Sequence, residues 1–98
     1  MKTSESNSLL GDWRPIKSEI PDYDLDSELL HFLEDGVFLW EHPKYENQPT
    51  VAKLKFWTEG AKLHYTTFEG PTWVDYWFED ETLILRPLHG YKTHWKKY

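Results

Sequence analysis

Five histidines are the residues of this chain whose chemistry could support a metal site. They are His31, His42, His64, His89 and His94. No two of them have the spacing that places two metal ligands on one face of a helix, and no His-x-His pair places two on one face of a strand. A pairing of His89 with His94 across the last turn is the one alternative. We therefore predict no metal site and no cofactor, and interpret the histidines as surface residues.

The acidic residues of segment 19–28 form a second group with chemical potential. They are Glu19, Asp22, Asp24, Asp26 and Glu28, with no basic residue among them. Paired carboxylates serve acid–base chemistry where an apolar pocket shifts the pKa of one of them, whereas a loop that contains Pro21 is more often solvated. Two interpretations stay open: a solvated acidic loop, or a docking surface for a basic protein.

Nucleophilic catalysis has no recognisable motif in this sequence. There is no cysteine, no Gly-x-Ser-x-Gly motif and no glycine-rich loop that could cradle a phosphate. Because no set of catalytic residues can be identified, we expect a non-enzymatic binding protein.

Segment 72–78 carries aromatic residues on both faces of a predicted strand. Trp73, Asp75 and Trp77 alternate with Val74, Tyr76 and Phe78. Successive side chains of a strand point to opposite faces, so either both faces are covered or an aromatic patch is exposed for binding. If Asp75 faces inward between two tryptophans, it needs a hydrogen-bonding partner from the protein or a ligand.

Composition sets the context in which these residues act. The 98 residues carry a net charge of −6, and 17% of them are aromatic. A negative charge argues against nucleic acid or an anionic membrane as partner, because both attract basic surfaces. The lack of cysteine favours a reducing compartment, and no signal peptide or membrane-spanning run is visible. We expect a cytoplasmic protein with a flexible arm over residues 1–8 and one domain over residues 9–98.

Alternating apolar and polar residues between turn signals predict about eight short strands. The expected strands span residues 10–16, 29–34, 37–41, 51–58, 61–67, 72–78, 82–86 and 91–97. Short turns make neighbours in sequence antiparallel neighbours in the sheet. A long twisted meander hides its two edges by closing. The sequence therefore predicts an all-β fold, an antiparallel up-and-down meander that closes into a small barrel.

Residues 29–34 fit two structures. Their leucines, together with Leu25, have the spacing of an amphipathic helix. The alternative is a strand that turns through Asp35 and Gly36 into residues 37–41. We favour this hairpin, because an Asp-Gly pair between two apolar runs is a strong short-range hairpin signal.

The start of the predicted barrel carries a short motif. Residues 9–13 are Leu-Leu-Gly-Asp-Trp, and segments 32–38 and 78–85 both combine strand residues with an acidic turn. With these features the chain resembles the small bacterial lipocalin-like proteins of the calycin group, whose sequences often open with a leucine pair followed by Gly-x-Trp. The resemblance covers most of residues 9–97 and implies a lipocalin-like barrel.

The resemblance also implies a role for Trp13. In the wider lipocalin group the tryptophan of this motif plugs one end of the barrel, and a basic residue from near the last strand lies over it. Trp13 would be that plug, and Lys96 or Lys97 would cover its ring by a cation–π contact.

One function for such a barrel is to hold a small apolar or aromatic ligand in its interior. The candidate ligand-binding residues are Trp40, Phe56, Tyr65, Trp73, Asp75, Trp77 and Trp95, with Phe38, Leu54, Leu63, Leu83 and Leu85 completing the lining. Burial of apolar area would supply affinity, and one or two polar groups would fix the ligand's orientation.

The other function is protein binding, in particular neutralisation of a toxin by an immunity protein. Toxic nucleases are often basic, so an acidic loop could steer their association. The candidate partner-binding residues are Glu19, Asp22, Asp24, Asp26 and Glu28, with Trp57 and Tyr76 facing outward. We slightly favour this function, because the chain is short for a barrel with a large cavity.

Overall fold

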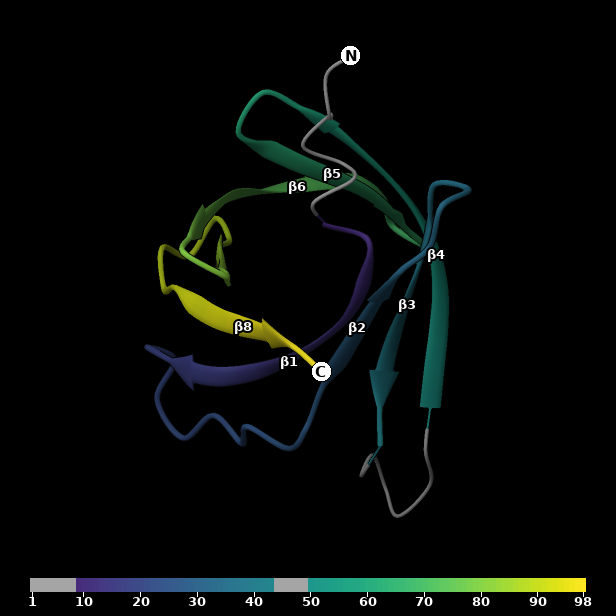
Figure 1. The fold of residues 1–98 in the computed structure, drawn as a ribbon. Coiled ribbons are helices and arrows are strands. Elements are labelled where there is room, and N and C mark those ends of the chain that lie inside the picture. Colours follow the sequence, from purple (N-terminus) through teal and green to yellow (C-terminus); the bar gives the residue numbers. More distant parts are fainter. Residues whose placement is uncertain (1–8, 44–49) are drawn as a thin grey trace.

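The computed structural model describes residues 9–43 and 50–98, which form a closed antiparallel barrel. The strands follow one another round the barrel in chain order (Figure 1). They are β1 (Gly11–Ser18), β2 (Leu29–Phe32), β3 (Val37–His42), β4 (Thr50–Glu59), β5 (Lys62–Thr67), β6 (Gly70–Glu79), β7 (Thr82–Arg86) and β8 (Thr93–Lys97). The predicted all-β meander is confirmed. The arm predicted over residues 1–8 lies outside the described residues.

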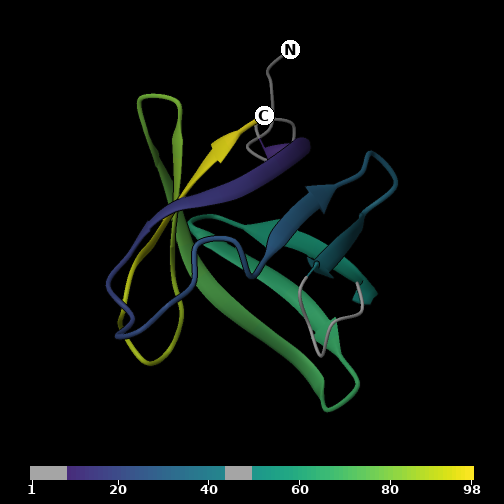
Figure 2. The same ribbon diagram turned by 90° about the horizontal axis from the view of Figure 1, so that it is seen from below.

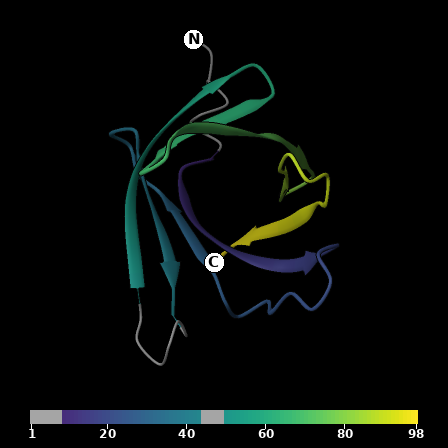
Figure 3. The same ribbon diagram turned by 180° about the vertical axis from the view of Figure 1, so that it is seen from behind.

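The barrel closes because β1 pairs with both β2 and β8. Trp13 lies opposite Leu30 on one side and opposite Lys97 on the other. Figure 3 shows the two ends of the described chain, purple β1 and yellow β8, lying side by side. The register with β8 shifts between Pro15 and Lys17, where the proline has no N–H to donate to the ladder.

The ambiguous segment 29–34 contains a strand and no helix. β2 turns into β3 with the Leu33 N–H donating to the Val37 carbonyl oxygen at 2.8 Å. Gly36 has a φ of +79° within this turn, a conformation that glycine adopts without strain. The predicted hairpin is therefore confirmed.

The last strand is shorter than the predicted 91–97. The Gly90 N–H donates to the Pro87 carbonyl oxygen at 2.9 Å, which makes a turn. The Lys92 backbone then bonds to Glu19 of the loop before β2. Because residue 92 bonds to that loop, regular pairing with β1 and β7 begins only at Thr93.

β6 presents its two faces opposite to the prediction. Val74 and Tyr76 are 6% and 1% exposed, and they pair with the buried Leu63 and Leu85. This register turns Val74 and Tyr76 into the core. The predicted inward residues Trp73, Asp75 and Trp77 therefore lie on the outer face, and the predicted outward Tyr76 lies inside. Burying valine and tyrosine instead of Asp75 avoids desolvating a carboxylate.

The outer face of β6 satisfies Asp75 with two cations. Lys62 Nζ and Arg86 Nη2 lie 3.3 and 3.2 Å from its oxygens. Partial burial raises the pKa of Asp75, but these two hydrogen bonds outweigh it and lower the pKa below its ordinary value. Lys62 also lies 3.8 Å from the centroid of the Trp73 ring, so this partly buried tryptophan packs against the same ion-pair group on the outer face.

Trp13 closes one end of the barrel. Its side chain is 2% exposed, and its indole N–H donates to the Leu9 carbonyl oxygen at 2.8 Å. The ring packs against Phe78, and Lys97 Nζ lies 5.2 Å from its centroid. The implied plug is confirmed, with Lys97 as the cation. A Cβ at Gly11 would come within 3.2 Å of the Lys97 side chain, so glycine leaves room for this contact.

His31 joins β1 to β3 through two carboxylates on the outside of β2. Its Nδ1 and Nε2 atoms lie 2.7 and 2.9 Å from oxygens of Asp12 and Glu41. Burial lowers the pKa of His31, but the hydrogen bonds and charges of the two carboxylates outweigh burial and raise it above the ordinary value.

Replacing Trp13 should destabilise the barrel far more than replacing an exposed tryptophan. Trp13→Ala removes a buried ring and leaves a cavity, so we expect a loss of about 3–5 kcal/mol in the free energy of unfolding. The control Trp57→Ala acts at a side chain that is 41% exposed and should cost about 1 kcal/mol or less. Urea unfolding measures both losses. Equal losses would mean that Trp13 does not hold the barrel closed.

The stability of the protein should depend on pH through His31. A pKa raised by folding means that the two ion pairs stabilise the barrel fully below about pH 6.5. This stability is lost as the pH rises through the raised pKa. His31→Gln should flatten that decline in urea unfolding between about pH 6 and pH 8. An NMR titration of wild-type His31 that gives a pKa below the ordinary value would contradict the assignment.

Candidate ligand-binding site

The barrel contains a cavity of about 280 Å³ towards the end away from Trp13. Its apolar wall is made by inward side chains of six strands, namely Leu30, Phe32, Phe38, Leu63, Val74, Leu85 and Trp95. Polar groups reach it from Tyr23, Glu28, Tyr65, His89 and Thr93. A mainly apolar cavity with a few polar groups is typical of a small-molecule site.

Two loops meet at the rim of this cavity. The Glu19 N–H donates to the Lys92 carbonyl oxygen at 2.9 Å, and the Lys92 N–H donates to Glu19 Oε1 at 3.0 Å. Figure 2 shows the two loops, blue 19–28 and yellow 87–92, at the same end of the barrel. Both loops contribute to the lining, through Ile20, Tyr23, Pro87 and His89.

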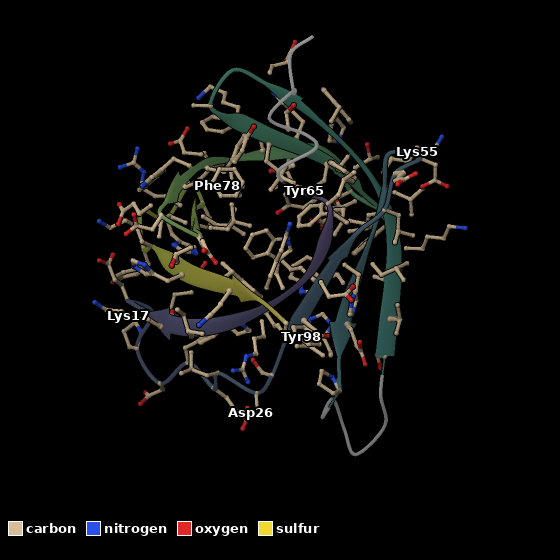
Figure 4. All side chains as sticks on the ribbon, viewed as in Figure 1. Lys17, Asp26, Lys55, Tyr65, Phe78 and Tyr98 are labelled. Carbon is tan, nitrogen blue, oxygen red and sulfur yellow. The ribbon has the colours of Figure 1, made fainter. Side chains whose placement is uncertain are left out.

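An aromatic cluster stiffens one wall of the cavity. Phe38 stacks on Phe32 at 5.3 Å between ring centroids and meets the edge of Tyr65 at 5.5 Å. Trp40 meets Tyr65 at 6.5 Å with the ring planes at 89°. Edge-to-face contacts of this kind are favourable and fix the ring positions. Figure 4 shows Tyr65 reaching into the ring of strands, whereas Lys17 and Lys55 point outward.

Glu28 is the carboxylate of the cavity. Its Oε1 accepts a hydrogen bond from the Trp40 indole N–H at 2.7 Å, and its Oε2 accepts one from the Tyr23 hydroxyl. Both donors are neutral. Within residues 9–43 and 50–98, no lysine, arginine or histidine forms an ion pair with Glu28. A carboxylate can accept about four hydrogen bonds, so Glu28 keeps capacity for a ligand.

Two tyrosine hydroxyls beside Glu28 stay protonated at neutral pH. Burial raises the pKa of Tyr23, and the hydrogen bond to Glu28 and its charge raise it further. Burial also raises the pKa of Tyr65, with a further contribution from the charge of Glu28. Both side chains are therefore neutral hydroxyls that can take part in hydrogen bonds.

Thr93 is a buried polar residue of the cavity wall. Its side chain is 6% exposed, and its Oγ1 accepts a hydrogen bond from the Trp95 indole N–H at 2.9 Å. This bond satisfies the indole and fixes the Trp95 ring against the cavity.

Comparison with solved structures identifies the architecture. A lipocalin-like protein from Bacteroides uniformis has a TM-score of 0.76 at 17% identity, covering 93% of this chain and 99% of that chain. The present chain therefore has a lipocalin-like fold. An uncharacterized protein from Bacteroides eggerthii has a TM-score of 0.69 at 15% identity, covering 91% of this chain and 98% of that chain. No protein-family model and no curated protein matches the chain.

The lipocalin-like barrel brings together three of the seven predicted ligand-binding residues. Trp40, Tyr65 and Trp95 line the cavity. Phe56 is buried behind it, with its ring 5.0 Å from that of Phe32. The other three, Trp73, Asp75 and Trp77, lie on the outer face of β6, as described above.

The predicted partner-binding residues are divided between several places in the lipocalin-like barrel. Asp22, Asp24 and Asp26 are exposed on the 19–28 loop, and Trp57 is 41% exposed on β4. Glu19 is exposed but bonds to the Lys92 backbone. Glu28 lines the cavity and Tyr76 lies in the core, so these two face away from any partner that docks on the outside.

Among the cavity residues that the sequence analysis did not assign to the site, Tyr23 and Thr93 were missed for different reasons. No sequence signal distinguishes Tyr23 from a solvated loop residue, because its role depends on how the 19–28 loop folds back. Thr93 carried a usable signal, because it lies two residues before Trp95 and so shares its face of β8.

Among the described residues, no group of three His, Asp or Glu side chains is placed to hold a metal ion. No described helix is long and apolar enough to span a membrane.

Removing the Thr93 hydroxyl should destabilise the cavity wall. Thr93→Val keeps the shape of the side chain but leaves the Trp95 indole N–H without its acceptor, at a cost of about 1–3 kcal/mol. Thr93→Ser keeps the acceptor and should cost less. Urea unfolding of the two variants makes the comparison. A valine variant at least as stable as the serine variant would show that this hydrogen bond contributes nothing.

Proposed function

We propose that the protein binds a small, largely apolar ligand in the cavity of the barrel. The observation that carries this proposal is the cavity of about 280 Å³, walled by aromatic and aliphatic side chains, in a barrel of only 98 residues. Tight packing normally fills a protein interior, so space of this size under two rim loops needs a reason, and a ligand supplies one.

The cavity sets the size of the ligand. At about 20 Å³ for each non-hydrogen atom, somewhat less than the volume per molecule in liquid water, it holds roughly ten to fourteen such atoms. A bicyclic aromatic compound with one polar substituent has this size. Apolar burial would contribute about 25 cal/mol per Å², and Glu28, Tyr65 and Thr93 would orient the polar substituent.

The toxin-neutralising function stays a prediction without an observation that favours it over ligand binding. Asp22, Asp24 and Asp26 lie on the exposed part of the 19–28 loop. The inward positions of Glu28 and Tyr76 leave that surface with fewer of its predicted contacts. The expected cytoplasmic location likewise stays a prediction.

Filling the cavity should weaken ligand binding. Val74 lies in the cavity wall and is 6% exposed, so Val74→Phe places a ring in the cavity. We expect the affinity for naphthylmethanol, a neutral probe of the right size, to fall by about tenfold or more, since the lost apolar contacts are worth about 1.4 kcal/mol or more. Isothermal titration calorimetry measures the affinity.

The matched control is Val51→Phe, because Val51 is 53% exposed on β4. It makes the same chemical change outside the cavity and should leave the affinity for the probe unchanged. Circular dichroism checks that both variants are folded. Failure of the wild-type protein to bind the probe, or equal binding by the folded Val74→Phe variant, would contradict the proposal.

A further inference from the structure

We propose that the ligand carries an organic ammonium group, which pairs with the Glu28 carboxylate. This inference rests on the proposed function and adds the charge of the ligand to it. Its starting point is a carboxylate that lines a mainly apolar cavity and whose partners in the described part of the chain are the neutral Trp40 and Tyr23.

Glu28 is partly buried, so its carboxylate has lost part of its contact with water. Taking a charge out of water is unfavourable unless hydrogen bonds and an opposite charge compensate it. The hydrogen bonds from Trp40 and Tyr23 supply the first kind of compensation. Among the described residues, no basic side chain supplies the second. A ligand ammonium would complete the set.

Asp75 offers a comparison within the same chain, because cations of the protein itself neutralise this carboxylate. Asp75, on the outer face, is held between Lys62 and Arg86 at 3.3 and 3.2 Å. Within residues 9–43 and 50–98, no lysine or arginine pairs with Glu28, whose two oxygens accept hydrogen bonds from Tyr23 in the loop and Trp40 on β3. The difference marks Glu28 as a group held ready for a cation from outside the chain.

The surroundings of Glu28 favour a cation over an anion. The rings of Trp40 and Tyr65 stand beside the carboxylate and keep the local dielectric low, which strengthens an ion pair formed there. Aromatic rings also attract ammonium groups. Glu28 and the exposed Asp22 belong to one rim loop, and their negative charges favour a cation over an anion at the mouth of the cavity.

His89, the basic side chain that lines the cavity, does not oppose this arrangement. Its Nδ1 accepts a hydrogen bond from the Tyr91 N–H at 3.1 Å. This hydrogen bond directs Nδ1 to the backbone of its own loop, and among the described residues His89 forms no ion pair with Glu28.

A matched pair of probes tests the inference. Naphthylmethylamine is an ammonium at neutral pH, whereas naphthylmethanol has the same shape and no charge. By isothermal titration calorimetry, the wild-type protein should bind the amine about tenfold to a hundredfold more tightly than the alcohol, as expected for a charge-assisted hydrogen bond. Glu28→Gln should lose this preference and bind the alcohol within about threefold of wild type.

Two features make the variant interpretable. The glutamine carbonyl oxygen can still accept from Trp40, and its amide can donate to the Tyr23 oxygen, so the rim keeps its hydrogen bonds. The control is Asp22→Asn, which removes one charge from the same loop at an exposed residue. Asp22 has a φ of +58°, a conformation that asparagine tolerates, and the control should keep the preference for the amine.

The outcomes separate the inference from the proposed function. If the alcohol binds and the amine binds no more tightly, the ammonium inference is wrong and the ligand-binding function stands. If Asp22→Asn reduces the preference as much as Glu28→Gln does, direct pairing with Glu28 is wrong. If neither probe binds the wild-type protein, the proposed function fails, and the inference fails with it.

Discussion

The pairing of β1 with β8 is the constraint on which the rest of the structure depends. Without it the meander would be an open sheet with two free edges. Closure sets Trp13 opposite Lys97, which brings the cation over the plug ring. It also ties the loop after β1 to the loop before β8 through Glu19 and Lys92, so one set of backbone bonds organises both ends of the barrel.

The two ends are then built differently. At one end Trp13 and Phe78 fill the interior with rings, and the indole N–H is satisfied by the Leu9 backbone. At the other end the strands are joined by longer loops that arch over the rim and leave a cavity of about 280 Å³. The end closed by Trp13 is tightly packed, whereas the end covered by loops keeps open space. A small barrel can therefore be stable although its interior is not completely filled.

The fold was predicted well from the sequence, because a meander depends on signals between residues that are close along the chain. The Asp35-Gly36 turn and the alternation within strands decide a meander, and closure follows from strand twist. The site was harder to predict, because it depends on which face of β6 points into the barrel and on how the 19–28 loop folds. Trp73 and Val74 are both apolar, so alternation alone cannot say which faces the core, and pairing with Leu63 decides it. Glu28 looked like its acidic neighbours, and only the bonds from Trp40 and Tyr23 set it apart.

The position of Glu28 links the fold to its binding chemistry. It is the last residue before β2, where the loop must return to the barrel, so its side chain can turn inward while the three aspartates before it stay in solvent. The donors that hold it come from β3 and from the loop itself, which means that a change in either would move the carboxylate. A carboxylate that is held from two sides, and that pairs with no cation among the described residues, is preorganised, and preorganisation lowers the cost of binding a cation.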